Sequence, residues 1–129
     1  MAGEIETLAN IAVDCGFRIH KDIGPGLLES AYEMLLFESL SKRGLLVERQ
    51  VAVSLKANGI VIDNAFRADL FVERTLLIEV KSTEAHAPVH AKQLLTYLRL
   101  MDLPLGLLMN FGAGTFKEGI RRIVNNHVE

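Results

Sequence analysis

The hydrophobic pattern of this 129-residue chain changes its period at Gly44, and that change limits the folds open to it. Before Gly44, apolar residues recur every three or four positions, as on one face of a helix. From Leu46 to Lys56 they alternate with polar residues, as in a strand with one buried face. Asn58-Gly59 then marks a tight turn between two strands. The sequence therefore predicts helices first and an antiparallel hairpin after them.

The remaining elements follow from the same patterns. A first helix is expected over about Glu4–Ile23, ended by Gly24-Pro25-Gly26, and a second over Leu27–Arg43. The other expected elements are strands at Ile60–Val72, Leu76–Lys81 and Leu105–Phe111, with a helix at Pro88–Met101. The tail at 115–124 fits a helix and a strand equally well, and both stay open.

The order α-α-β-β-β-α-β with a tail predicts an α/β fold, a mixed central sheet flanked by helices. Length and an apolar half of the composition suit one domain over residues 1–129. The net charge of −2 argues against a basic nucleic-acid coat protein. The first residues resemble no signal peptide and no apolar run could span a membrane, so we expect a cytoplasmic protein without membrane contact.

Three charged residues on two neighbouring strands are the chief candidates for chemistry. Alternation predicts that Arg67, Asp69 and Phe71 share one strand face, and that Glu79 and Lys81 share a face of the next strand. Two carboxylates are hard oxygen ligands of the kind that hold Mg²⁺ or Mn²⁺, and a metal so held polarises a phosphate and activates water. A nearby lysine can orient that water. The alternative is an ordinary cross-strand salt bridge.

Two helices offer further candidates. His90, Gln93 and Tyr97 share one face of the later helix, where Gln93 and Tyr97 can contact a sugar-phosphate backbone or belong to the surface and core edge. Glu29 lies in the first turn of the second helix, where the helix dipole by itself favours a carboxylate. The histidines lack further zinc ligands at suitable spacing.

These residues together resemble a known family. Gly26, Glu29 and Tyr32 match the GxxExxY pattern that names a set of small bacterial and archaeal proteins. The resemblance extends over nearly the whole chain, through Phe66-Arg67-Ala68-Asp69-Leu70, Glu79-Val80-Lys81, Gln93-Leu94-Leu95-Thr96-Tyr97 and Gly106-Leu107-Leu108-Met109-Asn110-Phe111. That family is grouped with the PD-(D/E)XK nuclease superfamily, whose core is a restriction-endonuclease-like αβββαβ unit. Here Ala68 replaces the proline of the superfamily name.

The resemblance implies a role for each candidate residue. Asp69 and Glu79 match the metal-binding carboxylates, Glu29 matches a helix glutamate that completes the metal shell, and Lys81 matches the catalytic lysine. Gln93 and Tyr97 resemble a Q-x-x-x-Y element of RecB-like nucleases, which implies contact with nucleic acid.

The leading hypothesis is a Mg²⁺-dependent nuclease, a metal-dependent phosphodiesterase that hydrolyses DNA and accepts Mn²⁺ as a substitute. The alternative is a catalytically inactive nucleic-acid-binding or protein-interaction module on the same fold. A third reading is a hairpin with purely structural salt bridges. Because a lone domain of this size has little surface for target selection, a homodimer or a partner protein is also expected. The choice between DNA and RNA, and between endo- and exonuclease, stays open.

Overall fold

The computed structural model describes residues 2–126, with side chains from residue 4 onward. Five strands form one sheet in the order β1-β2-β3-β4-β5. Strands β3 and β4 are parallel, and the other neighbours are antiparallel. The elements, in chain order, are α1 (Ala2–Ile23), α2 (Glu29–Lys42), β1 (Val47–Ala57), β2 (Ile60–Val72), β3 (Leu76–Lys81), α3 (Pro88–Met101), β4 (Leu105–Asn110), α4 (Phe116–Gly119) and β5 (Ile120–Val124).

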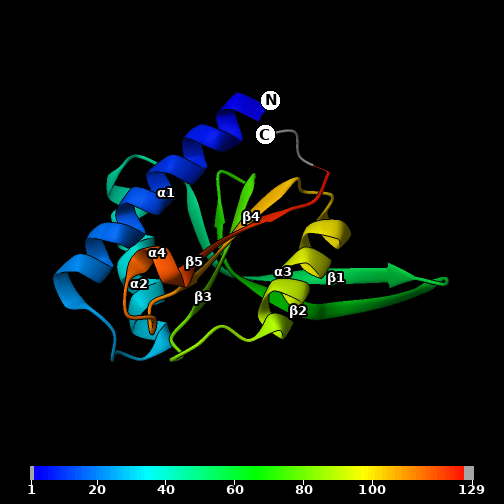
Figure 1. The fold of residues 1–129 in the computed structure, drawn as a ribbon. Coiled ribbons are helices and arrows are strands. Elements are labelled where there is room, and N and C mark those ends of the chain that lie inside the picture. Colours follow the sequence, from blue (N-terminus) through cyan, green and yellow to red (C-terminus); the bar gives the residue numbers. More distant parts are fainter. Residues whose placement is uncertain (1, 127–129) are drawn as a thin grey trace.

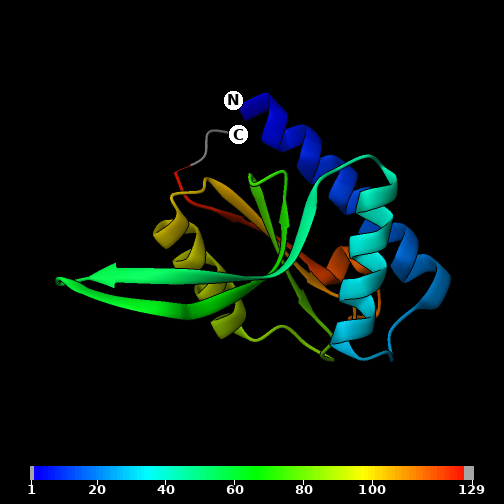
Figure 2. The ribbon, with the colours of Figure 1, turned by 180° about the vertical axis from the view of Figure 1, so that it is seen from behind.

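The helices cover both faces of the sheet. Helices α1 and α2 lie against one face and α3 against the other (Figures 1 and 2). Helix α3 is the crossover that parallel strands require, because β3 and β4 run in the same direction. The predicted α/β architecture with its mixed sheet and flanking helices is therefore confirmed.

Each side of the sheet has its own apolar core. Ile78 and Val80 pack in the larger cluster with residues of α1 and α2, and Leu77 packs in the smaller one with Leu94 and Leu98 of α3. The alternation predicted for β3 is confirmed by this division. Every residue of β4 is buried, as expected of a strand covered on both faces.

The tail that the sequence left open contains a short helix and a strand. Thr115 caps α4 by accepting a hydrogen bond from the Glu118 amide at 3.2 Å. The chain then pairs antiparallel with β4, from Met109–Ile120 to Leu105–Val124. Tertiary pairing with β4 decides the outcome, which local periodicity could not settle.

Strands β1 and β2 extend well beyond the rest of the molecule as a two-stranded ribbon (Figures 1 and 2). Its tip is the predicted turn, in which Asn58 and Gly59 both have the left-handed φ values, 52° and 74°, that such turns need. None of the helices within residues 2–126 is long and apolar enough to cross a membrane.

Candidate active site

The candidate site lies where β2 separates from β3. Backbone pairing between these strands ends at Leu70 and Ile78, although the same register would next place Asp69 opposite Glu79. Beyond that point side chains replace the ladder. The Asp69 amide donates to Glu79 Oε1 at 3.1 Å, and the Val80 amide donates to Asp69 Oδ2 at 2.8 Å. Each carboxylate is thus held by the backbone of the opposite strand.

This reciprocal arrangement brings the half-buried carboxylate of Asp69 against the buried carboxylate of Glu79. Glu79 is only 5% exposed. Burial, and then the adjacent charge of Asp69, raise the pKa of Glu79 from 4.5 to about 8, while Lys81 acts in the opposite direction. The pair therefore needs either a proton or a cation between its oxygens.

Lys81 lies close to this pair at the end of β3. Its charge also lowers the pKa of His90, where burial is the first cause and Lys81 the second. Within residues 2–126, Lys81 forms no ion pair with Asp69 or Glu79, whose oxygens accept backbone amides instead. The cross-strand salt bridge considered from the sequence is therefore not what the structure contains.

Glu29 lies further from the pair than the sequence implied. Glu29 as a whole is exposed at the start of α2, but its carboxyl group is partly shielded from solvent. This shielding and the charges of Asp69 and Glu33 raise its pKa, against the opposing effect of Lys81. Glu29 thus experiences the charges of the same site. In the described part of the chain, however, no three His, Cys, Asp or Glu side chains are close enough together to hold a metal ion. The structure brings Asp69, Glu79 and Lys81 together and leaves Glu29 at the rim.

The GxxExxY residues fix the loop that presents Glu29. Gly26 has a φ of 122°, which a side chain would strain. The buried Tyr32 hydroxyl donates to the Gly24 carbonyl and accepts from the Leu27 amide at 3.2 Å. Its ring stacks on Phe111 with centroids 4.6 Å apart. Glycine and tyrosine thus hold the loop before α2, and with it the position of Glu29.

On α3, Tyr97 is affected by the carboxylate pair, as His90 is by Lys81. Burial, followed by the charges of Glu79 and Asp69, raises the pKa of its hydroxyl. One face of its ring is covered by Phe66, with centroids 3.9 Å apart. Gln93 is exposed on the same helix, and no hydrogen bond within the described residues joins it to the carboxylates.

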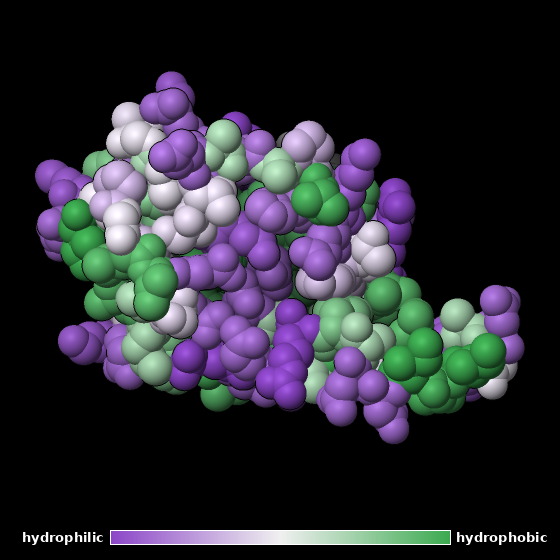
Figure 3. All heavy atoms as spheres, turned by 90° about the horizontal axis from the view of Figure 1, so that it is seen from below, coloured by the Kyte–Doolittle hydropathy of each residue, from purple (hydrophilic) through white to green (hydrophobic). Residues whose placement is uncertain are grey.

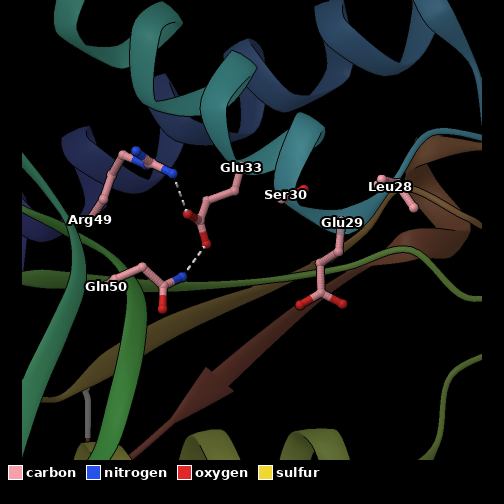
Figure 4. Close-up of a pocket in the computed structure, with 6 residues that line it drawn as sticks. All are labelled: Leu28, Glu29, Ser30, Glu33, Arg49 and Gln50. Carbon is pink, nitrogen blue, oxygen red and sulfur yellow. Dashed lines mark hydrogen bonds and ion pairs between the residues drawn. The ribbon is translucent and has the colours of Figure 1, made fainter.

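Sequence reasoning missed three residues beside Asp69. Glu33, Arg49 and Gln50 line a groove of about 520 Å³ together with the start of α2 (Figure 4). Glu33 is 4% exposed and receives Arg49 Nη2 at 3.1 Å and Gln50 Nε2 at 2.6 Å. The available signal was its position one helical turn after Glu29, which places both carboxylates on one face of α2.

The donor set suits a divalent cation that keeps much of its water. Asp69 and Glu79 supply hard carboxylate oxygens, and burial together with the charge of Asp69 raises the pKa of Glu79, an effect that a bound cation would offset. Mg²⁺ is bound in this way through one or two carboxylates, whereas zinc needs a fuller set of protein ligands. The residues present therefore fit a hydrated hard cation.

Comparison with known proteins agrees with the fold. A family model described as the PD-(D/E)XK nuclease superfamily matches residues 6–123. The chain belongs to this superfamily, whose members are nucleases that generally use divalent metals and act on nucleic acid. No curated protein and no solved structure gave a significant match. The match does not extend to the GxxExxY subfamily, which stays a prediction.

Proposed function

We propose that this protein is a Mg²⁺-dependent nuclease that hydrolyses phosphodiester bonds of DNA in the cytoplasm, with Mn²⁺ as a substitute ion. The observation that carries the proposal is the pair Asp69 and Glu79, each held by the other strand's backbone beside Lys81. Structural carboxylates at this depth would be paired with cations of the protein. These two instead face each other, which is costly without an ion to bind.

The position of each site residue suggests its role in the proposed reaction. Asp69 and Glu79 would hold the ion, and Glu29, at the rim, would reach it through a bound water. Such an ion polarises the scissile phosphate and lowers the pKa of a water. Lys81 would orient the attacking water and stabilise charge on the phosphate. Tyr97 and Gln93 on α3 would position the nucleic-acid backbone.

The first prediction tests this assignment by cleavage. Asp69→Ala and Lys81→Ala should reduce cleavage of single-stranded, duplex and branched DNA by about a hundredfold or more, as loss of a catalytic group does. Lys56→Ala, which removes an exposed lysine from the far ribbon, is the matched control and should cleave normally. RNA is included as a substrate, with Mg²⁺ and Mn²⁺ in separate reactions. Wild-type protein that cuts nothing with either ion would rule the proposal out.

A second function is favoured by a specific observation. Glu29 stands apart from the carboxylate pair, and Phe66 already covers one face of Tyr97. Both features suit a nucleic-acid-binding or protein-interaction module that no longer cuts. Binding of branched or single-stranded DNA that is equally tight in wild type and Lys81→Ala, without cleavage, would establish this alternative.

A further inference from the structure

At Gln50 and Asp69, the paired side chains of β1 and β2 switch from the face of the sheet that α2 covers to the face that α3 covers. One position before, Arg49 is paired with Leu70, and both lie on the α2 side, where Leu70 belongs to the larger core. One position after, Val51 is paired with Ala68, and both pack in the core beneath α3. Residues two apart in a regular strand share a face. The expectation that Asp69 simply shares a face with Arg67 and Phe71 is therefore wrong, because alternation breaks at this position.

Gln50 makes the crossing possible in an unusual backbone conformation. Its φ is 50°, in the left-handed region that a residue with a side chain rarely adopts within a strand. Gln50 and Asp69 are also the one pair left out of the β1–β2 register between Val47–Val72 and Val53–Phe66. Strain of this kind persists only where surrounding contacts impose it, and it concentrates at functional sites.

The side chain of Gln50 bridges two carboxylates. Its Nε2 donates to Glu33 Oε1 at 2.6 Å and to Asp69 Oδ1 at 3.3 Å. Glu33 is itself held by Arg49 at 3.1 Å, so the amide is anchored on α2 (Figure 4). Each oxygen of Asp69 therefore has its own donor: Oδ1 accepts from the Gln50 amide, and Oδ2 accepts from the Val80 backbone amide.

We propose that Gln50 is a positioning residue, whose strained backbone and bridging amide fix the Asp69 carboxylate in the orientation that faces Glu79. Glu33 and Arg49 anchor that amide. The consequence for ion binding rests on the proposed function. The orientation of Asp69 itself does not, because it is a property of the metal-free protein.

Two variants of Gln50 separate positioning from stability. Gln50→Gly removes the amide and relieves the positive φ, which offsets part of the stability lost with the hydrogen bonds to Glu33 and Asp69. Gln50→Met keeps a side chain of similar length but has no N–H to donate and adds no charge beside Glu33 and Asp69. In both variants, with EDTA present, exchange of the Val80 amide should quicken roughly five- to tenfold relative to the amides of β4, as expected for loss of a hydrogen bond. The Kd for Mn²⁺ should rise at least about fivefold.

Asn64→Gly is the matched control, because Asn64 also lies within a strand of the ribbon with a φ of 55°. It should leave Val80 exchange and Mn²⁺ affinity unchanged. Val80 exchange that is equal in wild type, Gln50→Gly and Gln50→Met would overturn the positioning role. Wild-type protein that binds no Mn²⁺ would overturn the proposed function, while the exchange measurement would still decide the role of Gln50.

Discussion

Glu79 shows how one buried side chain couples this site to pH. Its ordinary pKa is 4.5 and its pKa in the folded protein is about 8, because burial and then Asp69 disfavour its charged form. Between these values the folded protein holds a proton that the unfolded chain has released. The stability that this proton contributes is complete below about pH 4.5 and is lost as the pH rises toward 8.

The second prediction follows from that sign. In EDTA, the free energy of unfolding should fall between pH 5 and pH 8 by up to about 1.4 kcal/mol per pH unit, the slope for one proton. Urea titrations across this range measure it. Glu79→Gln should have a shallower slope, though not a flat one, because the pKa values of Glu29 and Glu33 are raised as well. Saturating Mn²⁺ should stabilise the wild type most at high pH, where it replaces the proton. An unchanged slope in Glu79→Gln would contradict this account.

Site residues that are recognisable by their charge could be found from the sequence. Site residues whose role depends on backbone conformation or on tertiary contacts could not. Asp69, Glu79 and Lys81 stand out as charges within apolar strands, and the structure does bring them together. Gln50 gave no signal, because its φ of 50° results from the ribbon crossing the sheet. Glu33 looked like any helix glutamate until Arg49 and Gln50 were placed against it.

At the scale of elements, the start of α2 is held by a side chain rather than by a cap. Leu28 precedes the helix and has no side-chain cap to offer its amides. Tyr32 secures the preceding loop from inside the helix, and Ser82 Oγ at the end of β3 donates to the Leu27 carbonyl at 2.8 Å. The loop is thus fastened both to its own helix and to the strand that carries Glu79 and Lys81.

The third prediction concerns this fastening. Tyr32→Phe keeps the ring on Phe111 but leaves the Leu27 amide and the Gly24 carbonyl without their partner, so it should cost about 1–2 kcal/mol in urea unfolding. Tyr97→Phe is the matched control, because its ring also stacks on a phenylalanine while its hydroxyl faces the carboxylates. That control should melt like the wild type. Equal losses in both variants would show that the hydroxyl of Tyr32 does not hold the loop.

The elements themselves were predictable because each has a strong local pattern. The predicted ranges agree with the observed ones to within two residues, from the first helix to β4. The structure of the tail was not predictable, because its helix has only four residues and its strand depends on pairing with β4. Strand pairing is a long-range property that local periodicity does not contain.

At the scale of the whole molecule, the ribbon is the part that the fold leaves uncovered. Its pairs Val53–Phe66, Leu55–Ile62 and Ala57–Ile60 place uncharged residues on one face. Tyr97 covers Phe66, but nothing in the described chain covers the outer pairs, and Figure 3 shows the hydrophobic surface that results on the protruding ribbon. Nucleic-acid backbones are bound mainly through the charges of lysine and arginine, which this face lacks. A second copy of this chain presents the same uncharged face. We therefore propose a homodimer in which the ribbons of the two copies contact each other.

The fourth prediction tests the ribbon as the contact between two copies. Ile62 is 50% exposed on the uncharged face, and its neighbour Val61 is 60% exposed on the opposite face with Lys56. Ile62→Ser should shift sedimentation toward the monomer at concentrations where the wild type is a dimer, whereas Val61→Ser should sediment like the wild type. Both residues pair within the outer ribbon, with Leu55 and Lys56, so Mn²⁺ affinity at Asp69 and Glu79 should be unchanged in both variants. A monomeric wild type, or equal weakening by both variants, would mean that the ribbon face does not join two copies.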